Sequence, residues 1–215
     1  MGYERRRSLP VVIDHLVYAT PDIDATVEAL AARLGVRPTA GGRHPGLGTR
    51  NALLDLGGGS YLEVIGVDGD AAPDGPRPFG LDRIAEPRLA TWAARVEGLD
   101  ERVARGRAAG YDPGPARPMS RRRPDGTELH WRLTSPSAEA VELVPFLIEW
   151  GPGTEHPSTT SAHGCRLTRF AGEHPRPEAV TAALAALGLE LAVSPAASPA
   201  LVAVIEGPDG AVELR

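Results

Sequence analysis

The stretch IDHLVYATPDIDATVEALAARLG, residues 13–35, decides the fold because a strand pattern passes directly into a helix pattern within it. β-Branched and aromatic residues before the Thr-Pro-Asp turn signal predict a strand. Four apolar residues then recur at helical spacing: Ile23, Val27, Leu30 and Leu34. Acidic residues open this helix and Gly35 closes it, as is usual at helix boundaries. The stretch therefore predicts a strand followed by an amphipathic helix.

The same strand-and-helix pattern occurs three times along the chain. Residues 89–110 and 165–188 repeat it, and each helix again ends at a glycine. Short strand candidates separated by Gly- and Asp-rich turns follow each helix, so each unit has the order β–α–β–β–β. We expect paired modules at 10–152, made of module one at about 10–68, a Pro- and Gly-rich linker at 69–88 and module two at about 89–152, and a shorter third module at 160–215.

Tandem βαβββ units with a histidine on the opening strand resemble the vicinal oxygen chelate superfamily, which includes glyoxalase I, extradiol dioxygenases and bleomycin-resistance proteins. The segment GPDGAVEL at 207–214 resembles the hairpin that ends such modules. More narrowly, three segments resemble the glyoxalase-like branch of this superfamily: residues 41–68, RRRPDGTELHWRL at 121–133 and PFLIEW at 145–150. The resemblance implies an α+β fold in which tandem βαβββ modules form a cup-shaped mixed sheet with helices outside, plus a shorter third βαβββ-like module.

The resemblance also implies a site inside the cup. Superfamily enzymes hold a divalent metal between ligands from the first and fourth strands, and His15 and Glu63 match these two places. Imidazole and carboxylate suit Fe, Mn, Zn or Ni, and equally suit a catalytic acid and base without metal. The places equivalent to His15 in the later modules are occupied by threonines, Thr91 and Thr168. One bound metal ion and a metal-free cup therefore both remain open, and so does a histidine that is only hydrogen-bonded within its strand.

Module two leaves the second half of this site open. Its fourth-strand equivalent of Glu63 is Glu142 or Glu149, depending on register. His156 and His163, in the segment that joins modules two and three, are interpreted as linker residues.

Two polar segments are candidates for substrate binding. GGRHPGLGTRN, residues 41–51, offers His44, Arg50 and Asn51, and Asn51 is the only asparagine in the chain. Its glycines either form plain turns or let backbone approach a ligand. In the segment at 120–131, alternation places Arg121 and Arg123 on one face, with His130 on the following strand. This segment is either a solvated arginine strand or one wall of an anion site.

Composition excludes several classes of protein. All 23 basic residues are arginine, so neither a Schiff-base lysine nor a lysine-dependent phosphate loop is available. The net charge of −5 at pH 7 argues against nucleic-acid binding. Cys165 is the only cysteine, so no internal disulfide forms. The sequence contains neither a membrane-length apolar stretch nor a signal-type N-terminus, which predicts a cytoplasmic protein without a membrane partner.

Two functions fit these observations. The first is a glyoxalase-like enzyme of isomerase, lyase or dioxygenase type that acts on a small oxygenated, anionic metabolite. The alternative is a non-catalytic protein that binds or sequesters a small molecule, as bleomycin-resistance proteins do. An aromatic content of 5% favours the enzyme, because a binding cup uses aromatic platforms. The third module either covers the cup or pairs with another chain, which leaves a homodimer open.

Overall fold

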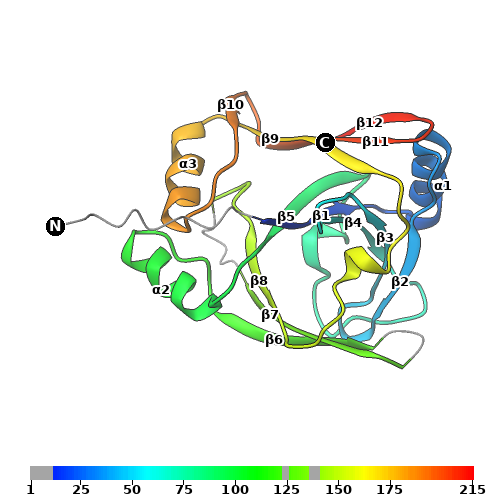
Figure 1. Ribbon diagram of the computed structural model, residues 1–215, viewed down its shortest axis with the longest axis horizontal. Helices are drawn as coiled ribbons and strands as arrows, with labels where there is room; N and C mark the ends of the chain where they lie inside the picture. The colour runs from blue at the N-terminus through cyan, green and yellow to red at the C-terminus, as the bar shows by residue number, and fades with distance from the viewer. Residues whose placement is uncertain (1–11, 123–125, 136–140) are drawn as a thin grey trace.

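The computed structural model describes residues 12–122, 126–135 and 141–215. Within these ranges, eight strands form one strongly curled mixed sheet in the order β2-β3-β4-β1-β5-β8-β7-β6 (Figure 1). Its strands are β1 (Val12–Ala19), β2 (Thr39–His44), β3 (Thr49–Asp55), β4 (Tyr61–Val67), β5 (Arg88–Arg95), β6 (Ala116–Arg122), β7 (Glu128–Thr134) and β8 (Phe146–Trp150). The helices are α1 (Ile23–Leu34), α2 (Leu99–Ala108) and α3 (Pro177–Ala186), with short 3-10 helices η1 (Pro45–Leu47), η2 (Pro78–Gly80) and η3 (Pro157–Thr159).

The eight-stranded sheet consists of two copies of one module. β1 and β5 pair antiparallel at its centre, and each pairs in parallel with the last strand of its own module, β4 or β8. From the centre outward the two halves therefore run β1-β4-β3-β2 and β5-β8-β7-β6. The predicted α+β fold of tandem βαβββ modules with a curled mixed sheet is confirmed.

Helix α1 forms where the apolar spacing predicts it. Asp22 caps its start, with the Asp22 side chain accepting the N–H of Ala25 at 3.0 Å. Gly35 ends it in the left-handed region at φ 74°, and its N–H bonds to the carbonyl of Ala31. Four apolar side chains of this helix are buried against the sheet: Ile23, Val27, Leu30 and Leu34. The helix therefore covers the outer face of the sheet.

The third module has its own four-stranded sheet, made of β9 (Arg166–His174), β10 (Val193–Pro195), β11 (Ala200–Gly207) and β12 (Gly210–Leu214). Its order is β10-β9-β11-β12, so the first strand, β9, lies between β10 and β11. In modules one and two, by contrast, the first strand lies beside the last strand of the module. The element order β–α–β–β–β is thus as predicted, while the strand order differs.

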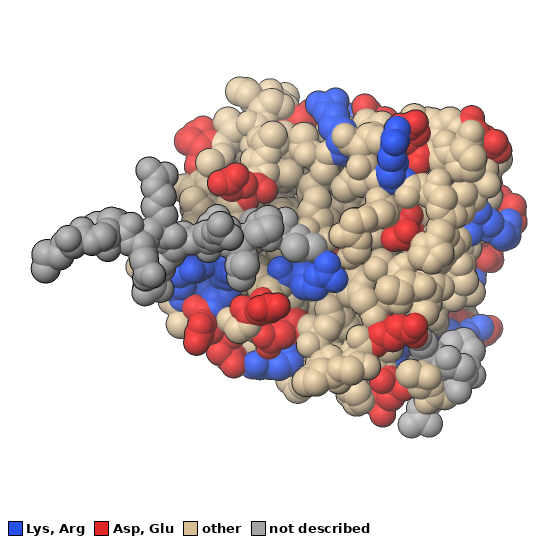
Figure 2. Space-filling model, in the orientation of Figure 1, with Lys and Arg blue, Asp and Glu red and all other residues tan. Residues whose placement is uncertain are grey.

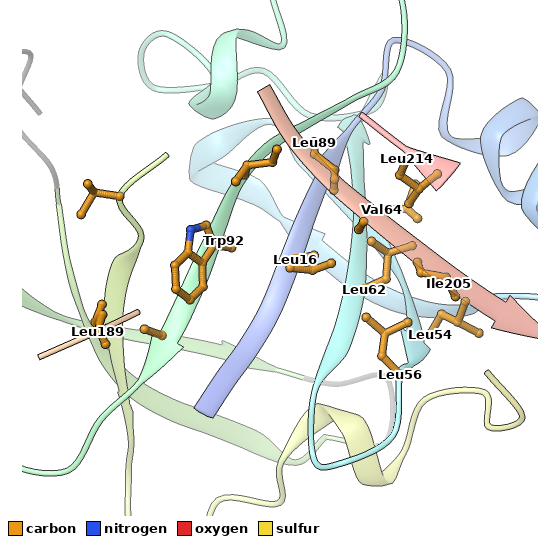
Figure 3. Close-up of a cluster of buried hydrophobic side chains, with 14 of the residues drawn as sticks. Leu16, Leu54, Leu56, Leu62, Val64, Leu89, Trp92, Leu189, Ile205 and Leu214 are labelled. Atoms are coloured by element: carbon orange, nitrogen blue, oxygen red, sulfur yellow. The ribbon is translucent and has the colours of Figure 1, made fainter. Parts of the chain in front are cut away.

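The third module packs on the outer face of the large sheet. Figure 3 shows Ile205 and Leu214, from β11 and β12, facing Leu16, Leu62 and other leucines of the central strands. These side chains share one apolar cluster with α1 and α3. The third module therefore supports the back of the cup and leaves its inner face to other segments.

The segment predicted as a linker contributes to the inner face. Phe79, Leu81 and Ile84 pack with Val17 and Ile65 in a second apolar cluster. Leu81 is 4% exposed, so this segment fills one end of the cup.

No helix within the described ranges is long and apolar enough to cross a membrane. On the face shown in Figure 2, acidic and arginine side chains of the described residues are interspersed.

Candidate active site

A β-bulge in β1 turns two consecutive polar side chains, Asp14 and His15, away from the outer core. Ile13 and Leu16 both pack into the outer cluster although they are three residues apart. The register shift between Ile13 and His15 makes this possible. Asp14 is fully buried and His15 is 4% exposed. His15 Nδ1 lies 2.7 Å from Asp14 Oδ1, at hydrogen-bond distance.

The Asp14 carboxylate is held by groups from distant parts of the chain. Its Oδ2 accepts the indole N–H of Trp150 at 2.9 Å and lies 3.0 Å from His156 Nε2. Burial alone would raise the pKa of Asp14, but the hydrogen bonds with His15 and His156 outweigh it and hold the pKa well below its usual range. Asp14 is therefore ionised, so Nδ1 of His15 carries the proton and donates it. In neutral His15 the lone pair is then on Nε2.

Glu63 lies on the other side of His15. His15 Nε2 and Glu63 Oε2 are 3.9 Å apart, and the Glu63 side chain is 14% exposed. Asn51 donates from Nδ2 to Glu63 Oε1 at 2.5 Å. Arg121, on the far edge of the sheet, donates from Nη1 to Asn51 Oδ1 at 3.4 Å. An imidazole, a carboxylate, a carboxamide and a guanidinium thus follow one another across the inner face.

The paired glycines at the start of GGRHPGLGTRN make room for these side chains. A Cβ on Gly41 would overlap Asn51 Oδ1, and a Cβ on Gly42 would lie 2.8 Å from Arg121 Nη1. The glycines therefore let strand β2 approach the side chains of the polar cluster closely. They also bring the two edges of the curled sheet near each other at Arg121.

His44 belongs to the same neighbourhood. It is half-buried, and its Nδ1 lies 2.9 Å from Thr49 Oγ1. Burial lowers the pKa of His44, and the Glu63 carboxylate opposes this effect only in part. His44 is therefore a neutral imidazole near neutral pH.

Aromatic rings close the site around His15. Tyr61 stacks on the imidazole with ring centroids 4.7 Å apart, and Phe146 contacts it edge-on at 5.5 Å. Burial raises the pKa of Tyr61 well above its ordinary value, so the phenol stays neutral. These contacts hold the imidazole in one orientation.

The donor set does not fit the metal site of the superfamily. Glu149 accepts the N–H groups of Gly98 and Leu99 at the start of α2, and Glu142 lies 3.2 Å from His174. Neither glutamate reaches His15, so His15 and Glu63 have no counterpart from module two. Among the residues that the structure describes, no three His, Cys, Asp or Glu side chains converge as metal ligands would.

Two predicted substrate-binding residues, Arg50 and His130, are not part of this cluster. Arg50 lies on the opposite face of β3, where it pairs with Asp24 of α1 at 3.0 and 2.7 Å. His130 is exposed on the outer side of β7, 3.7 Å from Glu128. Arg123 lies outside the described residues. Of the predicted set, the structure brings together His15, Glu63, His44, Asn51 and Arg121.

Sequence reasoning missed Asp14 and His156. An aspartate within an apolar strand was a usable signal, because a buried carboxylate requires partners. His156 had no such signal, since it contacts Asp14 from 142 residues away.

An apolar groove of about 620 Å³ lined by Trp92, Phe170 and Leu184 lies on the outer side of the sheet, away from His15.

Two βαβββ modules that share a curled sheet, with a polar site on its inner face, define a protein of the vicinal oxygen chelate class. A family model described as "Glyoxalase-like domain" matches residues 13–188. The chain belongs to this family, and with it to the vicinal oxygen chelate superfamily.

A solved structure shares the fold over most of this chain. A hypothetical protein from Staphylococcus aureus superposes with a TM-score of 0.67 over 88% of both chains, at 10% identity. Methylmalonyl-CoA epimerase from Mycobacterium tuberculosis is 23% identical over 65% of this chain and 88% of its own, with a TM-score of 0.45. A variant of the Streptomyces coelicolor methylmalonyl-CoA epimerase, in complex with 2-nitronate-propionyl-CoA, is 23% identical over 68% of this chain and 99% of its own, with a TM-score of 0.45. The epimerases are too distant to bear on the activity of this chain. No curated protein sequence matches it.

Proposed function

We propose that this protein is an enzyme of isomerase or lyase type that moves a proton on a small, oxygenated, anionic metabolite. The observation that carries the proposal is the row Asp14–His15–Glu63, in which a buried carboxylate orients an imidazole whose other nitrogen is 3.9 Å from a second carboxylate. An imidazole oriented in this way is suited to act as a general base near neutral pH.

The chemistry assigned to the site is proton abstraction next to a carbonyl. His15 Nε2 takes the proton from the α-carbon, the electron pair of the broken C–H bond moves into the carbonyl, and the carbonyl oxygen becomes negative. Return of this proton by His15 to the same face of the same carbon regenerates the substrate, whereas its transfer from His15 to Glu63, 3.9 Å away, and from Glu63 to a different position of the anion gives an isomer and restores both side chains. In a lyase reaction the electron pair instead expels a β-substituent, which leaves with its bonding electrons and takes the proton from His15. Neither outcome requires an external oxidant or reductant.

Arg121 supports an anionic substrate. Its guanidinium lies beside Asn51 at the same side of the site as Glu63. A guanidinium in a partly buried site binds a carboxylate or an enolate oxygen with charge-assisted hydrogen bonds. The rings of Tyr61 and Phe146 pack against His15, which is 4% exposed, so only a small group of a substrate would reach its Nε2.

Deuterium exchange tests the proposal without a known substrate. Purified protein is incubated in D₂O with a panel of 2-oxo and 2-hydroxy carboxylates, and loss of the α-proton signal is followed by ¹H NMR. We expect exchange on at least one compound, lowered about 100-fold or more in His15→Ala and in Glu63→Gln. His130→Ala is the matched control, because His130 is exposed and lies on the outer face. Exchange that is equal in wild type and His15→Ala overturns the proposal.

Metal analysis is a second check on the same site. The donor set gives no support to dioxygenase chemistry at His15 and Glu63. The metal content of protein purified without chelator is therefore expected to be the same in wild type and in His15→Ala. Stoichiometric metal that disappears in this variant and in Glu63→Gln would contradict the metal-free assignment.

The second candidate function is non-catalytic binding. One observation favours it: although aromatic residues are 5% of the chain, several gather on the inner face, where Trp131 and Trp150 lie 5.5 Å apart near Phe146. Such rings form a platform for a planar ligand. Binding that persists in His15→Ala, with no exchange in the wild type, would support this candidate over the enzyme.

A further inference from the structure

The connector between β8 and β9 carries a histidine, His156, that contacts the Asp14 carboxylate of the site. His156 is 14% exposed and lies 3.0 Å from Asp14 Oδ2. We propose that His156 is a positioning residue, which acts through Asp14 to keep the proton of His15 on Nδ1 and the lone pair on Nε2, facing Glu63. This inference rests on the proposed role of His15 as the base.

The hydrogen bonds of His156 determine which of its own nitrogens carries the proton. Its Nδ1 accepts the backbone N–H of Ser158 at 3.3 Å, as the cap of helix η3, and lies 2.8 Å from the Ser158 hydroxyl oxygen, whose O–H then donates to the same nitrogen. A ring nitrogen that accepts a backbone N–H has no proton of its own. In neutral His156 the proton is therefore on Nε2, which donates to Asp14.

Two donors then meet at one oxygen of Asp14. His156 Nε2 and the indole N–H of Trp150, at 2.9 Å, both bond to Oδ2. Their geometry directs Oδ1 toward His15 Nδ1, at 2.7 Å. A carboxylate oriented in this way accepts only the Nδ1–H tautomer of His15.

Ring packing joins the same residues. His156 contacts Trp150 edge-on with centroids 5.3 Å apart and Tyr61 at 5.6 Å, and Tyr61 stacks on His15 at 4.7 Å. His156 therefore touches both the carboxylate that orients the base and the ring that covers it. An ordinary linker histidine would make neither contact.

The test reads the tautomer of His15 directly. Protein labelled with ¹⁵N-histidine is studied by long-range ¹H–¹⁵N correlation at fixed neutral pH, with the His15 signals assigned from their loss in His15→Ala. Wild type is expected to show one tautomer, with the proton on Nδ1. Asp14→Asn is expected to move the proton to Nε2, because Trp150 and His156 hold the amide oxygen and turn the amide NH₂ toward His15.

Two substitutions of His156 separate positioning from folding. His156→Asn keeps an acceptor for the N–H of Ser158 but is too short to reach Asp14, whereas His156→Gln places an amide N–H near the position of Nε2. We expect His156→Asn to give a mixture of His15 tautomers and His156→Gln to restore the single one. Once an exchange substrate is found, His156→Asn should lower kcat about tenfold with little change in KM, as loss of an outer partner of a working histidine does.

His163→Ala is the control from the same connector, because His163 pairs with Asp55 at 2.9 Å and lies away from Asp14. A folded His156→Asn protein with an unchanged His15 tautomer overturns the inference, and so does an equal effect of His163→Ala. The NMR measurement needs no substrate. A tautomer change without His15-dependent exchange therefore refutes the proposed function alone, and exchange with an unchanged tautomer refutes this inference alone.

Discussion

Substitution of Gly41 by alanine is a direct test of how the polar cluster is assembled. Its Cβ would overlap Asn51 Oδ1 and lie 2.9 Å from Leu53 Cγ, so the carboxamide must leave Glu63. The lost hydrogen bond to a carboxylate is worth about 1.5–3 kcal/mol, and crowding in a packed region costs about 1–3 kcal/mol. Alanine recovers about 0.4–1 kcal/mol through the unfolded chain. We therefore expect a loss of about 3 kcal/mol in the free energy of unfolding.

The neighbouring glycine is the matched control. A Cβ on Gly42 would meet the flexible end of Arg121 at 2.8 Å, and this guanidinium can move aside. Gly42→Ala should therefore change the free energy of unfolding by less than about 1 kcal/mol. Urea denaturation followed by tryptophan fluorescence and by circular dichroism measures both variants. If Gly41→Ala is as stable as Gly42→Ala, the contact between Asn51 and Glu63 does not constrain strand β2, and the cluster as described is wrong.

Three further predictions concern the site and its surroundings. Arg121→Ala should weaken binding of an anionic ligand about tenfold or more in calorimetry, whereas Arg50→Ala, on the outer face, should leave it unchanged; equal losses would contradict this. Leu81→Ala should lower the free energy of unfolding by about 2–5 kcal/mol, because Leu81 is 4% exposed in the inner cluster; urea denaturation checks this, and no loss would refute the packing. The pKa of Asp14 lies below 3.8, so the stability that its charge contributes is fully present above pH 3.8 and is lost as the pH falls through the lower folded-state pKa; a ¹³C NMR titration in which this carboxyl protonates at or above 3.8 would contradict the network.

The sequence predicts well those features that depend on local periodicity. The spacing of Ile23, Val27 and Leu30 predicts helix α1, and the repeated strand-and-helix pattern predicts the paired modules. The third module shows the limit of such patterns. Its elements follow the predicted order, but strand pairing depends on packing against the outer face, through residues such as Leu214, and this is not encoded in the order of elements.

The candidate site was predictable only in part, for similar reasons. Strand alternation separates Arg50 from Asn51, because consecutive residues of a strand point to opposite faces, so these two side chains do not face one ligand. The β-bulge that releases Asp14 from alternation leaves no mark in the sequence. The contact between Asp14 and His156 depends on the path of the whole chain, since these residues are 142 positions apart.

The two halves of the cup have diverged in a way that bears on its chemistry. In module one the inner face of the last strand carries Glu63, whereas in module two the corresponding strand presents Phe146 and Ile148 inward and turns Glu149 outward to cap α2. A site built symmetrically from both modules would need acidic donors from both. Among the described residues, module one supplies the acidic side chains of the inner face, Asp14 and Glu63, while module two supplies rings and part of the apolar packing, so the site is asymmetric. This asymmetry places an oriented imidazole beside one carboxylate, with His15 Nε2 and Glu63 Oε2 3.9 Å apart, so the two groups of the site differ in chemistry.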